Sequence, residues 1–228
     1  MPIDKDTKLY GSFSGNPGNF GAHMMNEGFK ACGINAIYKP FKVSYAESAI
    51  RAMRTLGIAG AGVSAPLKES ALKWVDRVAP EADAIGSANT LLLQGEAVVA
   101  HNTDWLAAFS ALRARQFLLQ LDKLYILGNG GYARAIKYAT GKLGYPWECI
   151  TRADWHRITE LKDCVVFNAT PVRGIQVDRT CDFIDCHTDT PTGRKLALLQ
   201  GKEQFKLYTG QDYPDELYQK ILKKGVPS

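Results

Sequence analysis

The stretch that most constrains the fold is LYILGNGGYARAIKYA, residues 124–139. An apolar run of strand length ends at Gly128, passes through Gly130 and Gly131, and continues directly into helical spacing. Glycines permit a tight turn and a close approach of backbone to ligand, and the following helix would offer free N–H groups and the positive end of its dipole. The pattern predicts a Rossmann-type strand, turn and helix that bind a pyrophosphate. The alternative is a tight turn without a ligand.

Strand and helix patterns also alternate along the rest of the chain, which predicts an α/β fold. Residues 1–103 read as an α/β domain that ends in a hairpin around Gln94–Gly95, and Glu69 to Ala71 read as the start of a helix. Residues 104–195 read as a shortened Rossmann-type domain, and the helical patterns of 196–228 are expected to return to the first domain. The prediction is therefore two domains, with the sites at strand ends.

Composition narrows the class of protein. Hydrophobic residues make up 46% and charged residues 22% of the 228 residues, which is typical of a globular chain. The net charge of +5 is spread without blocks, so nucleic acid is not expected as a partner. No segment approaches the ~18 apolar residues of a membrane span, so a membrane is not expected as a partner either. The five cysteines are odd in number and lack CxxC spacing, and no secretory signal is seen, so we expect reduced thiols in a cytoplasmic protein. Cys181, Cys186 and His187 do not make a four-ligand set, and no metal is expected.

Polar residues follow several strand patterns of the first domain. Lys68 follows the apolar run Ala61 to Val63 and a Ser-Ala-Pro, while Asn89 and Asp104 lie at the two ends of the hairpin. Taken singly, each is more often a turn or surface residue. Because the strand ends of one α/β layer meet along one edge, together they predict a site that handles a hydroxyl proton.

Arg152 lies roughly 20 residues past the glycine turn, where a charged side chain chooses between NAD and NADP. An arginine there favours a 2′-phosphate and hence NADP. Asp154 is close enough to favour the opposite choice, and a surface arginine is the alternative interpretation.

Eight pieces of the sequence, in order along nearly the whole chain, resemble the shikimate dehydrogenase family, in particular its shikimate dehydrogenase-like branch. They are GSFSGNPGNFGAHMMN, YKPF, VSAPLKES, AIGSANTLL, AHNTDW, LGNGGYARA, NATP and LLQGKEQFKLYTG. The resemblance implies an NADP-dependent oxidoreductase of aromatic amino acid biosynthesis that interconverts 3-dehydroshikimate and shikimate, or a related small anionic cyclic acid, as a monomer or homodimer. It also implies roles for individual residues. The catalytic pair would be Lys68 and Asp104; the substrate would be bound by Ser12, Ser14, Asn19, Asn89 and Gln200; and the cofactor would be bound by Gly128, Gly130, Gly131, Ala133, Arg152 and Thr170.

The chain departs from the family pattern in two ways. Asn19-Phe20-Gly21 stands where the family has a Ser-x-Ser pair for the substrate carboxylate, and the stretches after Arg152 and after Cys186 are short. Two alternatives therefore stay open. One is a non-catalytic or regulatory binding protein, and the other is a dehydrogenase acting on quinate or an amino-shikimate.

Overall fold

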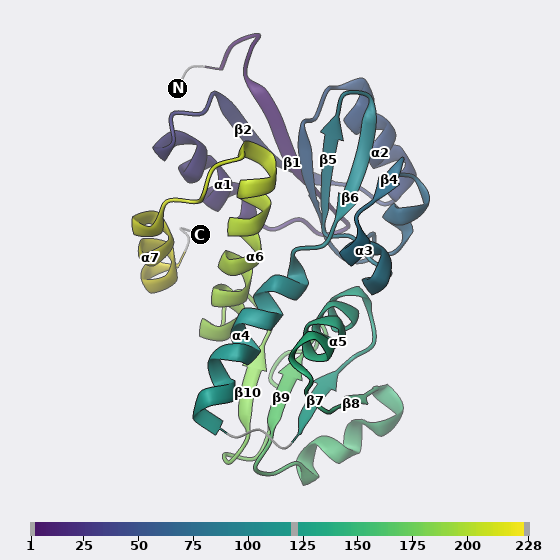
Figure 1. The fold of residues 1–228 in the computed structure, drawn as a ribbon, viewed down its shortest axis with the longest axis vertical. Coiled ribbons are helices and arrows are strands. Elements are labelled where there is room, and N and C mark those ends of the chain that lie inside the picture. The colour runs from purple at the N-terminus through teal and green to yellow at the C-terminus, as the bar shows by residue number, and fades with distance from the viewer. Residues whose placement is uncertain (1–2, 120–122, 226–228) are drawn as a thin grey trace. The chain divides into compact units, whose positions relative to one another are not determined.

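The computed structural model describes residues 3–119 and 123–225, and the chain forms two compact units. The first unit consists of Met1–Thr103 together with Gln200–Ser228, and the second of Asp104–Leu199. Helix α6 (Pro191–Thr209) contributes residues to both. Both units are α/β, as the alternation of patterns predicts (Figure 1).

The first unit is built on a six-stranded sheet of order β2-β1-β3-β5-β6-β4. Its strands are β1 (Lys8–Ser14), β2 (Ala36–Lys42), β3 (Gly60–Val63), β4 (Arg77–Val78), β5 (Thr90–Gln94) and β6 (Ala97–His101). The first three strands are mutually parallel, and the antiparallel β5 turns the chain so that β6 again runs in the direction of β3. The carboxyl ends of β1, β3 and β6 and the start of β5 therefore share one edge.

Helices cover both faces of this sheet. They are α1 (Phe20–Ala31), α2 (Ala46–Thr55), α3 (Pro80–Ile85) and the end of α6, whereas α7 (Asp215–Lys224) packs against α1. Phe13 packs with Ile50 and Met53 on the α2 side, whereas Tyr10 packs against Phe29 of α1 and Tyr208 of α6 on the other side. The amphipathic spacing of α1 and α2 thus buries one face of each helix against the sheet.

One local expectation for this unit needs correction. The helix expected to begin at Glu69 is only a single 3-10 turn, η1 (Ser70–Lys73), and the short strand β4 follows it. The backbone N–H of Ala88 binds the carbonyl of Lys68 at 2.9 Å. This long-range bond holds the segment before η1 against the start of β5.

The second unit has a parallel four-stranded sheet of order β10-β9-β7-β8. Its elements are α4 (Asp104–Leu119), β7 (Leu124–Leu127), α5 (Gly131–Leu143), β8 (Trp147–Ile150), the 3-10 helix η2 (Arg152–Glu160), β9 (Val165–Asn168), β10 (Asp182–Asp185) and the start of α6. Ile126 and Phe167 pack with α4 and α5, while Leu127 and Val166 pack on the opposite face. Burial on both faces is characteristic of a parallel sheet.

This unit is a shortened Rossmann-type fold. The connection from β8 to β9 contains only η2, and residues 169–181 join β9 to β10 without a helix. Across the described residues, no helix has the length and apolar character needed to cross a membrane.

Candidate active site

In the first unit, two of the predicted substrate residues, Asn89 and Gln200, meet in a hydrogen-bond network at the shared strand edge. Asn89, 2% exposed, donates from Nδ2 to Gln200 Oε1 and to Thr103 Oγ1, each at 2.9 Å. Its Oδ1 accepts the backbone N–H of Thr103 at 2.7 Å and the hydroxyl of Thr90 at 2.8 Å. Asn89 and Gln200, which lie 111 residues apart in sequence, are therefore direct partners.

Gln204, one turn of α6 beyond Gln200, extends this network. Its Nε2 donates to the carbonyl of Asn89 at 3.1 Å and to Thr90 Oγ1 at 3.0 Å. Thr103 and Gln204 were not predicted, although both lie inside the pieces NTD and LLQGKEQF that carry the family resemblance. The four-residue spacing from Gln200 places Gln204 on the same face of the helix, but the sequence does not show that this face is buried against Asn89.

Lys68 lies half-buried just after the carboxyl end of β3. The chain reaches it through a turn in which the Ser64 N–H binds the carbonyl of Phe13, and the peptide Ala65–Pro66 is cis. Lys68 is thus held next to the start of β5 at the same edge as Asn89. Asp104 follows β6 and Thr103, and it is the buried first residue of α4 in the second unit.

The two predicted serines play different roles in β1. Ser14 is buried, and its Oγ accepts the backbone N–H of Asn16 at 3.2 Å, a bond that shapes the following turn. Ser12 lies close to the hydroxyl of Tyr38. Burial raises the pKa of Tyr38 to about 12, and the nearby polar groups of Ser12 and Gly62 offset part of that shift.

Asn19 is exposed at the N-cap position of α1 and makes no side-chain capping bond there. The first turn of α1 contains no acidic residue. A Cβ added to Gly21 in that turn would lie 3.8 Å from the Tyr38 hydroxyl. The backbone N–H groups at the start of α1 and the hydroxyls of Tyr38 and Ser12 could therefore donate hydrogen bonds to an anion.

In the second unit, the predicted glycines form the turn from β7 into α5. Gly128 has φ of 99°, and a Cβ there would lie 2.7 Å from Thr170 Cγ2, so the position requires glycine. Gly130 caps α5, and a Cβ there would meet nothing within 4 Å. Gly131 begins the helix, whose first turn contains no acidic residue, and Ala133 is fully buried against the sheet.

The charged residue predicted to choose the cofactor is Arg152, which begins η2 and is exposed. Its neighbour Asp154 lies 3.1 Å from the hydroxyl of Thr151, which donates to the Asp154 carboxylate. Asp154 is therefore engaged locally, whereas no hydrogen bond or ion pair of the Arg152 side chain occurs in the part of the chain that the structure describes.

Thr170 lies beside the glycine turn after β9, and Asn168 fixes it there. The Asn168 Oδ1 accepts both the hydroxyl of Thr170 at 2.7 Å and its backbone N–H at 3.0 Å. Within the same unit, burial raises the pKa of Tyr132 well above its usual value, and the nearby Asp104 and Cys186 add to this shift. Tyr132 follows Gly131 at the start of α5.

The sequence is similar to those of known proteins. Residues 20–91 match the sequence profile of the shikimate dehydrogenase substrate binding domain. A shikimate dehydrogenase-like protein of Haemophilus influenzae is 38% identical over 143 residues, which are 63% of this chain and 52% of that protein. The shikimate dehydrogenase (NADP(+)) of Pyrococcus furiosus is 38% identical over 147 residues, 62% of this chain and 52% of that enzyme. The chain therefore spans about half the length of these curated relatives.

Solved structures extend the likeness over both units. A shikimate 5-dehydrogenase-like protein superposes with a TM-score of 0.79 at 28% identity, covering 97% of this chain and 98% of the other. The Thermus thermophilus shikimate 5-dehydrogenase, solved with NADP(H) and shikimate, has a TM-score of 0.79 at 20% identity, covering 96% and 100%. At that low identity the second likeness speaks for the fold alone.

Proposed function

We propose, from the premise that this chain belongs to the shikimate dehydrogenase family, that it is an NADP-dependent oxidoreductase acting on shikimate or a closely related cyclic hydroxy acid. The observation that carries the proposal is the amide network at the strand edge of the first unit, where Asn89 and Gln200 meet beside Lys68. In this proposal the first unit binds the acid and the second binds the cofactor.

The residues of the second unit fit a dinucleotide. Gly128 can adopt its backbone only as glycine, Gly130 leaves the start of α5 open, and the first turn of α5 carries no negative charge. These features suit a pyrophosphate at the helix N-terminus. The exposed Arg152 would bind the 2′-phosphate through charge-assisted hydrogen bonds. When bound, the nicotinamide would accept or donate a hydride.

In this proposal Lys68 transfers the proton that accompanies the hydride. Its ammonium form would donate a proton to the ring oxygen during reduction, and its neutral amine form would accept that proton during oxidation. Asp104, the first residue of α4, is the second catalytic residue in this proposal, as the family resemblance implies.

The Nε2 donor of Gln200 completes the substrate half. Because Gln200 Oε1 is occupied by Asn89, its Nε2 is the group that would donate to a ring hydroxyl. The carboxylate would lie at the start of α1, near Tyr38 and Ser12, in place of the family's Ser-x-Ser site.

The test measures oxidation of shikimate with NADP by the appearance of the reduced nicotinamide, alongside quinate and an amino-shikimate. We expect turnover with shikimate or one of these acids. In Lys68→Met, kcat should fall by about 10²-fold or more while KM changes little, since a proton-transfer group is lost. Lys73→Met, on the η1 turn, is the matched control. Retained turnover in Lys68→Met would refute the assignment.

A second candidate function is a binding protein without turnover. The observation that favours it is the trimmed second unit, in which β9 and β10 are joined without a helix. This candidate predicts calorimetric binding of the acid by the wild-type chain but no affinity for NADP at millimolar concentration, and that pair of results would replace the oxidoreductase proposal.

A further inference from the structure

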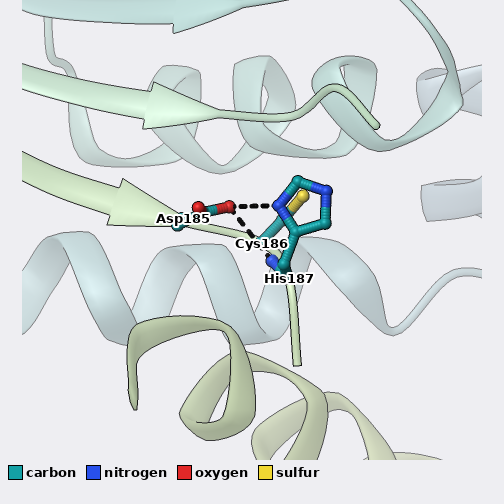
Figure 2. Close-up of side chains that lie close together, drawn as sticks. All are labelled: Asp185, Cys186 and His187. Carbon is teal, nitrogen blue, oxygen red and sulfur yellow. Dashed lines mark hydrogen bonds and ion pairs between the residues drawn. The ribbon is translucent and has the colours of Figure 1, made fainter. Parts of the chain in front are cut away.

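Three consecutive residues at the end of β10 gather metal-binding side chains that the proposed reaction does not use (Figure 2). Asp185, Cys186 and His187 each offer one ligand atom, and the three atoms lie within 4.8 Å of one another. Over residues 3–119 and 123–225, this is the only group of three or more such residues. We propose that it binds a transition-metal ion of the zinc class.

A hydrogen bond joins Asp185 to His187 through Nδ1 of the imidazole, so His187 would bind the ion through Nε2. His187 Nδ1 lies 2.6 Å from Asp185 Oδ1, with side-chain exposures of 11% and 14%. Asn168 Nδ2 also donates to Asp185 Oδ1, at 3.2 Å. Hydrogen bonds of this kind fix the orientation of ligating imidazoles and carboxylates in metal sites.

The thiol of Cys186 completes the set of three. It donates to the carbonyl of Thr170 at 3.6 Å, a weak bond that a metal–thiolate bond would replace. A tetrahedral zinc ion holds oxygen, nitrogen and sulfur ligands about 3.3–3.6 Å apart, as follows from zinc–ligand bonds of about 2.0–2.3 Å. Rotation of the side chains would bring the three atoms from their present spacing to that geometry.

The backbone beneath the three residues is held in place by the start of α6. The Thr192 hydroxyl binds both the N–H and the carbonyl of Asp185 at 3.0 Å, and the Thr190 hydroxyl donates to the His187 carbonyl at 2.7 Å. A Cβ on Gly193 would lie 2.0 Å from that carbonyl, so only glycine permits this packing. Such support reduces the ordering cost of binding an ion.

The donor set selects the metal. Thiolate and imidazole favour zinc, cobalt, nickel and copper ions over magnesium and calcium, which prefer oxygen ligands. Three protein ligands leave one position of a tetrahedral ion for water or another small ligand. Binding would release the thiol proton, so affinity should rise with pH.

The experiment titrates the full chain, prepared without a polyhistidine tag and treated with chelator and reductant, with Co²⁺. We expect one equivalent to bind with a thiolate-to-cobalt charge-transfer absorption that Zn²⁺ then displaces. Cys186→Ser should abolish that absorption, and His187→Gln and Asp185→Asn should each weaken binding by at least about tenfold. Cys32→Ser and His156→Gln are matched controls and should bind as the wild type does.

Two results would overturn the proposal. One is the absence of a charge-transfer absorption in the wild type. The other is its persistence in Cys186→Ser, because the sulfur ligand would then be another cysteine, such as Cys164 or Cys181, whose sulfurs lie 3.5 Å apart. Circular dichroism of each variant separates loss of the ligand from loss of the fold, and His187→Gln gives an independent result if Cys186→Ser does not fold.

Discussion

Replacing Asn89 by alanine should destabilise the first unit even though this residue is predicted to bind substrate. The side chain is 2% exposed and its partners Thr90 and Thr103 are equally buried. Without Asn89 Oδ1, the Thr103 N–H loses its acceptor at 2.7 Å and the Thr90 hydroxyl loses its acceptor at 2.8 Å, although the Thr90 oxygen still accepts from Gln204 Nε2 at 3.0 Å. A buried donor left unsatisfied costs about 1–3 kcal/mol, and the lost volume adds to this, so we expect Asn89→Ala to lower the free energy of unfolding by about 2–4 kcal/mol.

The assay combines urea unfolding with hydrogen exchange of the Thr103 amide. Exchange at Thr103 should accelerate more than exchange at amides in the centre of β5, because the bond that protects it is removed directly. Asn89→Asp keeps the oxygen acceptor and should retain much of the Thr103 protection. Asn16→Ala, at an exposed turn, is the control. The reasoning is refuted if Asn89→Ala unfolds within about 0.5 kcal/mol of the wild type, the range expected of surface substitutions.

Three further predictions concern the anion, the cofactor and pH. Ser12→Ala should weaken binding of the acid, measured by calorimetry, about 10- to 150-fold, which is the equivalent of losing a hydrogen bond to a charged group. Ser14→Ala should leave the affinity nearly unchanged because Ser14 serves the local turn. Equal effects of the two substitutions would contradict this division. Arg152→Ala should remove most of the preference for NADP over NAD in a fluorescence titration while leaving the affinity for NAD nearly as it was. Arg179→Ala is the control. An unchanged preference in Arg152→Ala would assign the choice of cofactor to another residue. Burial raises the folded-state pKa of Tyr38 to about 12, so its contribution to stability is full below about pH 10 and is lost as the pH rises toward 12. Tyr38→Phe should therefore flatten the decline of the unfolding free energy in that alkaline range, and a slope identical to that of the wild type would contradict the assignment.

Much of the fold follows from the sequence because local signals agree with the tertiary structure. The apolar run before Gly128 and the helical spacing after Gly131 produce β7 and α5, and the Gln94–Gly95 turn joins β5 to β6. The expectation at Glu69 was wrong because one 3-10 turn and a two-residue strand carry too few residues for a period to appear.

The site was only partly accessible from sequence for a different reason. Lys68, Asn89 and Asp104 could be predicted from their places at strand ends and from the family resemblance. The partnership of Asn89 with Gln204 depends on which turn of α6 faces the sheet, and the pairing of Asp185 with His187 depends on the path of the chain after β10. Neither path leaves a periodic signal in the sequence, so both needed coordinates.

The division of α6 between the two units has a consequence for protein synthesis. The second unit, Asp104–Leu199, interrupts the first, whose remaining residues come last in the chain. Phe205 and Tyr208 of α6 pack against Phe29 and Tyr10, so these early residues lack their partners until the final part of the chain has been made. A ribosome therefore delivers a complete second unit while the first still exposes an aromatic face, and during that interval the nascent chain is most open to chaperones and to aggregation.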